Sequence, residues 1–443
     1  MNKKTYLCIH GHFYQPPREN AWTGEIEPQP SAAPFHDWNE RILQECYKPN
    51  SEAVIVDAHD NVIKRVNNYK YFNFDFGPAL LNWIKNKHPK TYDRIIAADK
   101  ESVIDHHGHG NAIAMVYNHM IMPLANRRDK VTQVKWGTAD FRFHFGREPE
   151  GIWLPETACN EETIEVLAEE RINYIILDPS QADMIRTCNR GKWKDVSDGN
   201  IDTGIPYKCY VNNSKEKFIN IFFYNGTLSK NIAFDDHIYD SLRLLHRLEQ
   251  IPIPDAKKDY LISAAIDGET FGHHKKYTER TISYLFSEMI PGTNFHSVNY
   301  GEYLSLHPPE SEVKIKAGIL NEGTSWSCPH GVGRWKENCG CGTSEESPSQ
   351  EWRKPLRESL NWLRDNLNLI YENEGQKYFK DTWIARNEYI NVILDPGKES
   401  SERFFYFNTK HFLNKLETDQ CIKLLEMQKF SMLMFTSCGW FFS

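Results

Sequence analysis

The chain has 443 residues, of which 40% are hydrophobic and 25% are charged, a composition that indicates a globular protein with a substantial buried core. This length exceeds one ordinary compact core and suits a large α/β barrel with an added helical region. The formal net charge of −8 and the lack of a sustained Lys/Arg stripe exclude nucleic acid as the expected partner. No stretch approaches the roughly 20 apolar residues of a membrane span.

Two features of the sequence favour a reducing cytoplasm. The N-terminal segment MNKKTYLCIHGH has a short basic start, but it lacks the apolar stretch of a secretory signal. The ten cysteines are scattered along a chain that is far too large to need disulfide bonds for its stability. We therefore expect a cytoplasmic protein.

The first elements predicted along the chain are two strands separated by a long loop. Residues 5–10, TYLCIH, are mostly apolar and predict a buried parallel strand that ends at His10. Residues 17–36 are rich in Pro, Glu and aromatic residues, and their lack of any period predicts an ordered loop of the kind that often carries function. Residues 71–76 predict a second strand, and the Gly-Pro pair at 77–78 opens a helix with one apolar face.

The alternation of strand and helix continues through the middle of the chain. Strands are predicted at residues 151–154, 174–177, 218–224 and 260–266, and a helix is predicted over 160–170. Such alternation implies parallel strands. Residues 190–205 are polar and rich in Gly and Asp, which predicts an excursion from the barrel.

The pattern changes after about residue 310. Residues 351–373 and 409–430 have apolar residues at helical spacing. We therefore expect a (β/α) barrel over residues 1–310 and a mainly helical region over 311–443. Because the sequence stops at TSCGWFFS directly after an amphipathic helix, with three aromatic residues and no polar tail, we also expect the chain to be a fragment of a longer protein.

Carboxylates follow two of the predicted strands. Glu156 comes just past the strand in GIWLPET, residues 151–157. The apolar strand in YLISAAIDGETFGHH, residues 260–274, ends at Asp267, with Glu269 and His273 close behind it. In a parallel barrel the carboxyl ends of the strands form the catalytic face, so we expect these side chains to meet there.

Two carboxylates at the mouth of one barrel suit the cleavage of a glycosidic bond. One carboxylate attacks the anomeric carbon while the other protonates the departing oxygen. A separation of about 5 to 5.5 Å permits direct attack with retention of configuration, whereas roughly 6.5 to 9.5 Å leaves room for a water molecule and gives inversion. The sequence predicts the pair but not its separation.

The two strand ends also carry a resemblance to a known family. GIWLPE resembles the nucleophile segment of the family-57 glycoside hydrolases, and DGETFGHH resembles their D-x-E-x-x-G-H segment, within a resemblance that covers roughly residues 5–305. This family includes amylases, glucanotransferases and branching enzymes that act on α-glucans. The resemblance implies a distorted (β/α)7 barrel that needs no metal or other cofactor, with Glu156 as nucleophile and Asp267 as general acid/base.

Further segments resemble other motifs of the family and supply candidate substrate-binding residues. IHGHFYQPP is similar to the opening motif, although Phe13 and Tyr14 separate the second histidine from the glutamine. YNHMIMP resembles the second motif, and GTSWSCPHGVGRW resembles a Trp-rich fifth motif. The resulting candidates for binding an oligo- or polysaccharide, or for tuning the carboxylates, are His10, His12, Gln15, His119, Trp153, Glu269, His273, Trp326 and Trp335.

The expected reaction is a double displacement on the α-1,4 linkages of an α-glucan. Asp267, kept neutral by burial and by the charge of Glu156, donates a proton while Glu156 attacks. Water or a sugar hydroxyl then resolves the intermediate, so the enzyme is either a hydrolase or a transglycosylase.

Three alternatives remain open. A metal-dependent barrel hydrolase could use His10 and His12 with the histidines of DHHGHGN, residues 105–111, together with Asp267 and His273. A carbohydrate-binding homologue without activity could share the fold. The cluster of Cys328, His330, Cys339 and Cys341 could bind a structural zinc, although its spacings are tighter than usual and we expect reduced cysteines there.

Overall fold

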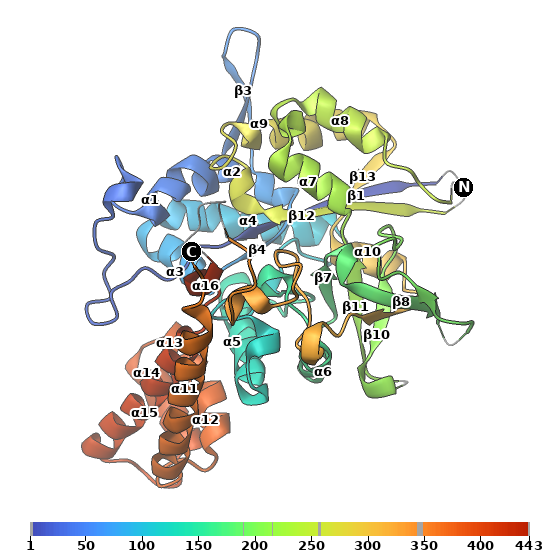
Figure 1. Cartoon of the computed structure of the whole chain (residues 1–443). Coiled ribbons are helices and arrows are strands. Elements are labelled where there is room, and N and C mark those ends of the chain that lie inside the picture. Colours follow the sequence, from blue (N-terminus) through green and yellow to red (C-terminus); the bar gives the residue numbers. More distant parts are fainter. Residues whose placement is uncertain (1–2, 189, 215, 256–257, 343–348, 442–443) are drawn as a thin grey trace.

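The computed structural model describes residues 3–188, 190–214, 216–255, 258–342 and 349–441. Its centre is a ring of seven mainly parallel strands, with helices packed around the outside (Figure 1). The seven strands are β1 (Thr5–Phe13), β4 (Asn73–Phe76), β5 (Ala114–Met115), β6 (Ile152–Trp153), β7 (Tyr174–Leu177), β11 (Phe218–Phe223) and β12 (Tyr260–Asp267).

The pairing of the strands follows the ring but is uneven. β1 pairs in parallel with β12 on one side and with β4 on the other, and β5 with β6 and β7 with β11 are also parallel. Isolated parallel bridges join β4 to the segment before β5 and join β6 to β7. The ring closes where the amide of Asn225 donates to the carbonyl of Ser263 at 2.8 Å. The fold is therefore a distorted (β/α)7 barrel, as expected.

The first strand is longer than the sequence predicts. The prediction ends it at His10, but β1 continues to Phe13, with His12 in register with Asp267 on one side and Asp75 on the other. Polar residues normally end a buried strand. Here His10 and His12 have polar partners, Asn73 and Asp75, on the neighbouring strand β4. The register places three ionisable side chains at the same height in the barrel.

Helices cover the outside of the ring, and additional strands extend it beyond β11 and beside β1. The helices of this part are α1 (Trp38–Ile42), α2 (Lys48–Ser51), α3 (Pro78–Lys87), α4 (Pro89–Asp105), α5 (Arg127–Phe145), α6 (Glu161–Glu169), α7 (Gly226–Phe234), α8 (Ser241–Glu249), α9 (Thr278–Tyr284) and α10 (Tyr300–Leu306). The additional strands are β8 (Ala182–Thr187), β9 (Lys194–Asp195), β10 (Tyr207–Tyr210), β13 (Phe295–Ser297) and β14 (Ser311–Ile315). A hairpin of β2 (Ala53–Val56) and β3 (Val62–Val66) projects from the body (Figure 1).

The boundary predicted at residue 310 is too early. β14 pairs with β10 and β8 in the sheet that begins at β7 and β11, so residues 311–315 belong to the barrel side of the molecule. The helical region starts at α11, beyond the loop that follows β14. Residues 190–205, predicted as an excursion, include the edge strand β9 of this same sheet.

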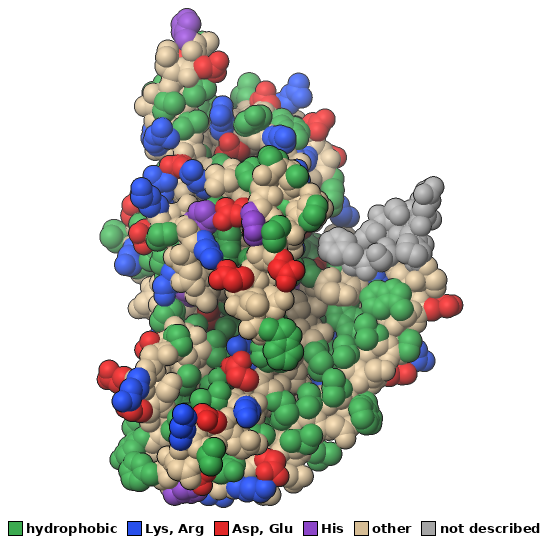
Figure 2. Space-filling view, turned by 90° about the vertical axis from the view of Figure 1, so that its left-hand side faces the viewer, with side chains coloured by type: hydrophobic (Ala, Val, Ile, Leu, Met, Phe, Trp, Pro, Cys, Tyr) green, Lys and Arg blue, Asp and Glu red, His purple; other side chains and the backbone are tan. Residues whose placement is uncertain are grey.

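The C-terminal region is a group of helices, of which all but the last lie in the lower part of Figure 1, whereas α16 lies higher, next to the barrel. They are α11 (Arg353–Gly375), α12 (Thr382–Glu388), α13 (Ile390–Leu394), α14 (Lys398–Asn408), α15 (Lys415–Leu433) and α16 (Cys438–Phe441). The inner faces of α11 to α15 share a core with Trp136 of α5, whereas Trp440 of α16 packs in a separate core. Figure 2 shows hydrophobic side chains gathered over the lower part of the face where these helices lie. No helix in the described ranges is long and apolar enough to cross a membrane.

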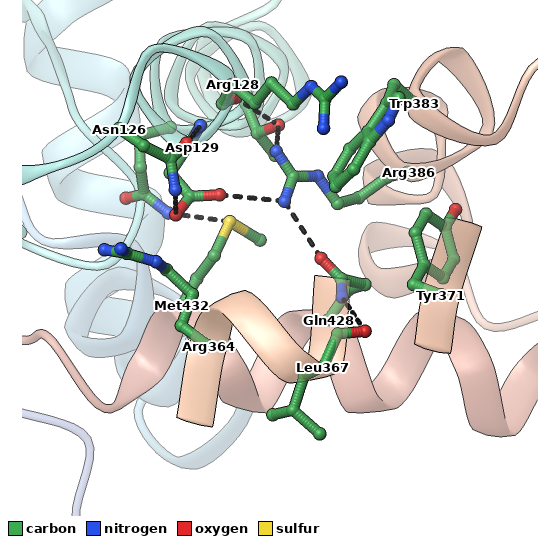
Figure 3. A network of polar contacts seen from close by, with 12 residues as sticks. Asn126, Arg128, Asp129, Arg364, Leu367, Tyr371, Trp383, Arg386, Gln428 and Met432 are labelled. Carbon is green, nitrogen blue, oxygen red and sulfur yellow. Dashed lines mark hydrogen bonds and ion pairs between the residues drawn. The ribbon is translucent and has the colours of Figure 1, made fainter. Parts of the chain in front are cut away.

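A buried polar network fixes the helical region to the barrel (Figure 3). Arg386 of α12 is 1% exposed and donates to Asp129 of α5 at 2.8 Å and to Gln428 of α15 at 3.0 Å. It also donates to Thr132 of α5 at 2.8 Å. A buried guanidinium needs such partners because an unpaired charge in the interior is costly. The network therefore holds α12 and α15 against α5.

Candidate active site

A cavity of about 830 Å³ opens at the carboxyl ends of the barrel strands. It receives side chains from β1, β12 and the turn after β6, together with the loop before α11 and the C-terminal segment. The predicted residues that line it are His12, Gln15, His119, Glu156, Asp267, Glu269, His273 and Trp326. The structure thus brings the two carboxylates, which are far apart in the sequence, to one cavity.

Two donors hold the side chain of Glu156. Its Oε2 atom accepts from the indole of Trp326 at 2.9 Å and from the hydroxyl of Ser327 at 2.6 Å. Burial raises the pKa of Glu156, the hydrogen bonds lower it, and the nearby charge of Asp267 raises it, so that the net shift is upward. Both bonds fix the same oxygen, in a side chain that lines the cavity.

The backbone at Glu156 is left-handed. Glu156 has φ 59° and Thr157 has φ 50°, a conformation that costs roughly 1–2 kcal/mol for each L-residue. Gln181 holds the turn, because its amide donates to the carbonyl of Thr157 and accepts from the Thr157 hydroxyl, both at 2.8 Å. The amide of Trp326 donates to the carbonyl of Glu156 at 3.0 Å. Strain that neighbouring bonds maintain is typical of functional sites.

Glu269, and not Asp267 as expected, is the buried carboxylate of the β12 segment. Asp267, the last residue of β12, is exposed to the cavity, which corrects the expectation of a buried acid. Glu269 is 6% exposed and accepts from the hydroxyl of Tyr47 at 2.6 Å and from the amide of Tyr14 at 3.1 Å. Burial raises the pKa of Glu269, the hydrogen bond from Tyr47 lowers it, and the charge of Asp267 raises it. The net result is a pKa of about 7.

A chain of imidazoles and one aspartate forms the floor of the cavity. His12 lies 2.9 Å from Asp75 through Nδ1 and 3.1 Å from His119 through Nε2. Burial lowers the pKa of His12, but the charges of Asp75, Asp267 and Glu269 raise it to about 9. Burial and the charge of His12 hold the pKa of His119 well below its usual value. Asp75 therefore favours the protonated form of His12, whose other ring nitrogen lies against His119.

Two of the predicted substrate-binding residues lie beneath this floor. His10 is fully buried, 2.8 Å from Asn73 through Nδ1 and 3.0 Å from Asp75 through Nε2. Trp153 is also fully buried, with its ring stacked on those of His10 and His12. Neither lines the cavity, so the structure gives them a supporting place rather than a contact with substrate.

The two tryptophans of the Trp-rich segment have different surroundings. Trp326 lines the cavity and contacts the edge of Trp153, with ring centroids 5.3 Å apart. Trp335 is fully buried in a separate core with Val332 and Trp440 and does not line the cavity, which corrects its place among the candidate substrate-binding residues.

Gln15 and His273 lie at the rim of the cavity. The amide of Gln15 donates to the carbonyl of Tyr14 at 2.9 Å, and its oxygen accepts from Arg18 at 2.8 Å. His273 lies 2.5 Å from Glu45 through Nδ1. Both side chains are therefore oriented by neighbours while they line the opening.

Sequence reasoning missed several residues of the site. Asp75, which joins His10 and His12, could have been suspected from the polar residue inside the strand NFDF. The C-terminal segment gave no such signal. Ser437 donates its amide to the carbonyl of His119 at 2.9 Å and lies 2.5 Å from Nδ1 of that ring, while Cys438 lines the cavity.

Of the histidines in the metal-hydrolase alternative, His12 and His273 line the cavity, but the three of DHHGHGN do not. His106 and His107 both contact Glu302, at 2.6 and 2.8 Å, and His109 contacts Glu150 at 2.8 Å. Within the described residues, the group of three or more metal-binding side chains that converges is the one at Cys328, His330, Cys339 and Cys341. This geometry does not support a catalytic metal at the barrel mouth.

Comparison with known proteins agrees with the arrangement of the fold. The model of glycosyl hydrolase family 57 matches residues 10–316, and a domain of unknown function (DUF3536) matches residues 349–443. An exo-type maltose-forming amylase from Pyrococcus sp. ST04 superposes with a TM-score of 0.67 and 16% identity, over 99% of this chain and 75% of that one. A 4-alpha-glucanotransferase from Thermococcus litoralis superposes with a TM-score of 0.53 and 15% identity. The match covers 96% of this chain and 55% of that one.

One curated relative has a detectable sequence match. Alpha-amylase 1 of Dictyoglomus thermophilum is 24% identical over 135 residues, which is 29% of this chain and only 19% of that protein. The fold and the site are those of a (β/α)-barrel enzyme, with a carboxylate-lined cavity at the carboxyl ends of the strands that is compatible with glycosidic-bond cleavage. The chain belongs to glycosyl hydrolase family 57.

Proposed function

We propose that the protein is a retaining glycosidase or glucanotransferase that acts on α-1,4-linked glucan. The observation that carries the proposal is that Glu156 and Asp267 line one cavity in a member of glycosyl hydrolase family 57. The similar structures include an amylase and a 4-alpha-glucanotransferase, whose names indicate an α-glucan. The aromatic and aliphatic lining, with Trp326 beside Glu156, suits the apolar face of a sugar ring.

The proposed reaction proceeds in two displacements. Glu156 attacks the anomeric carbon while Asp267 gives its proton to the oxygen of the departing sugar, which leaves a β-linked glycosyl ester on Glu156. Asp267 then takes a proton from water or from an acceptor hydroxyl, whose oxygen displaces Glu156 and restores the α configuration. Protonated His12 stabilises the carboxylates that carry negative charge in this cycle.

Chemical rescue separates the two roles. In Glu156→Ala, azide enters from the face that the nucleophile has vacated, and we expect a β-glycosyl azide from an activated α-glucosyl substrate. In Asp267→Ala, the covalent intermediate still forms from a substrate with a good leaving group, and azide then gives the α-glycosyl azide. Without azide, Asp267→Ala should lower kcat on natural glucan by about 10²- to 10⁴-fold.

Glu269→Ala is the matched control, because Glu269 lines the same cavity and is also a carboxylate. We expect azide to leave its activity unchanged and to give no glycosyl azide. An α-glycosyl azide from Glu269→Ala, with none from Asp267→Ala, would move the acid/base role to Glu269. Inactivity of the wild-type chain on every linear and branched α-glucan would contradict the proposed substrate.

A further inference from the structure

Four soft ligands converge in the loop that precedes the helical region. The Sγ atom of Cys328 lies 3.9 Å from that of Cys339 and 3.9 Å from that of Cys341, and Cys341 Sγ lies 3.4 Å from Nδ1 of His330. The ligand atoms of all four residues lie within 4.8 Å of one another. Four side chains separated by up to thirteen residues therefore point at one small volume.

These distances match the edges of a zinc tetrahedron. With Zn–S near 2.3 Å and Zn–N near 2.0–2.1 Å, tetrahedral angles place two sulfurs about 3.8 Å apart and a sulfur and a nitrogen about 3.6 Å apart. A disulfide would need the sulfurs at about 2.05 Å, and the three cysteines Cys328, Cys339 and Cys341 are free. The geometry is that of a closed metal site, not of a disulfide.

We infer that Cys328, His330, Cys339 and Cys341 bind a structural zinc ion. Three thiolates and one imidazole fill the tetrahedron and leave no open position, which is the arrangement of structural rather than catalytic zinc. Soft sulfur ligands also favour zinc over calcium, magnesium or manganese. The tight C-x-H and C-x-C spacings, unusual in sequence, are accommodated because the two pairs come from opposite ends of the loop.

The surroundings suit the charge of such a site. Zinc with three thiolates and a neutral imidazole carries one net negative charge. The fully buried guanidinium of Arg353 lies close enough to all three thiols to interact with them electrostatically. Arg353 also donates to Gln350 at 2.5 Å, and Gln350 donates to the carbonyl of Cys341 at 3.0 Å. A second layer of hydrogen bonds and charge of this kind is typical of metal sites.

The zinc would stabilise the loop that holds the nucleophile. Cys328 directly follows Ser327, whose hydroxyl donates to Glu156. Cys328 also packs in a core with Trp335 and Trp440, so it joins the loop to the C-terminal segment. The ion is thus a positional support for two donors of the site, and it takes no part in bond cleavage.

Metal analysis of the full chain tests the inference. Protein purified under reducing conditions and dialysed against metal-free buffer should hold about one zinc per chain. Cys339→Ser should lose nearly all of it, while the matched control Cys188→Ser, a free half-buried cysteine on the barrel side, should keep it. His330 is exposed, so His330→Ala should fold and should weaken zinc binding by more than about tenfold in competition with a chromogenic chelator.

Cobalt provides a readout that needs no variant. The apo wild-type chain titrated with Co²⁺ should develop the thiolate-to-metal charge-transfer band and the intense ligand-field bands of a tetrahedral site. Wild-type protein that holds far less than one zinc and gives no tetrahedral cobalt spectrum would overturn the inference, as would Cys188→Ser losing zinc to the same extent as Cys339→Ser. Because neither readout involves glucan, the result is independent of the proposed glycosidase activity.

Discussion

Two donated hydrogen bonds set the ionisation of Glu156. The bonds from Trp326 and Ser327 oppose the effect of burial on the pKa of this carboxyl, which must be ionised to attack. Burial also raises the pKa of Glu269, to about 7, and there the hydrogen bond from Tyr47 opposes it. Each of the two buried carboxyls therefore has a donor that favours its charged form.

Replacing Trp326 by Phe tests this arrangement. The substitution keeps an aromatic ring but removes the N–H that donates to Glu156, so the pKa of Glu156 should rise further. A hydrogen bond to a charged group contributes about 1.5–3 kcal/mol, which corresponds to an upward move of about one pH unit or more in the acid limb of kcat/KM. The pH profile of the variant measures this shift.

Tyr224→Phe is the control for the same measurement. Tyr224 also contacts Trp326, with ring centroids 6.2 Å apart, but its hydroxyl donates to Asp178 and not to Glu156. The acid limb of kcat/KM for Tyr224→Phe should stay within experimental error of the wild type. If Trp326→Phe also leaves the limb in place, the indole does not control the charge of Glu156.

At this scale the sequence predicted where Glu156 and Asp267 lie but not how they are held. A carboxylate that directly follows a strand of a parallel barrel lies at the carboxyl end of that barrel. The indole that fixes Glu156 is 170 residues away along the chain, and the left-handed turn depends on Gln181, so no local pattern contained either feature. Asp267 was expected to be buried because it ends an apolar strand, yet the side chain after the last buried position points into the cavity.

Among the elements, the long apolar strands were the most predictable. Residues 174–177 and 218–224 were predicted nearly as observed, because mostly apolar runs of this length bounded by polar residues are typical of buried strands. The two-residue strands β5 and β6 are too short to give a pattern of their own, and pairing with neighbours defines them. The same reason explains the missed extension of β1, whose polar residues find partners only in the folded barrel.

The buried ion pair of α5 and α12 leads to a prediction about stability. Arg386→Met should leave Asp129 buried and without its cation, which costs about 3–5 kcal/mol in the free energy of unfolding. Urea denaturation measures the loss. Lys398→Met is the control, since Lys398 is 89% exposed and its pair with Glu402 is 3.6 Å long, and it should leave the midpoint nearly unchanged.

The double variant Arg386→Met with Asp129→Leu separates charge from packing. Replacing both partners by apolar side chains removes the uncompensated carboxylate, so much of the lost stability should return. Equal destabilisation by Arg386→Met and Lys398→Met would show that the network in Figure 3 contributes little to holding the helices on the barrel.

The whole molecule assembles its cavity from both ends of the described chain. His12 comes from the first strand, whereas Cys438 and Phe441 come from the last helix, which the helical region places over the barrel mouth. The barrel itself followed from alternating strands and helices, and from the family resemblance. The contribution of the C-terminal segment could not be predicted, because it depends on how the helices dock on α5 and not on any motif.

The configuration of the first sugar released tests the central claim, which is that Glu156 and Asp267 act together across one cavity by double displacement. Proton NMR can follow the anomeric signals of the product from an α-1,4-glucan during the first minutes, before mutarotation mixes them. The account predicts that the α anomer appears first and equilibrates later. A β anomer formed first would mean single displacement by water and would contradict it.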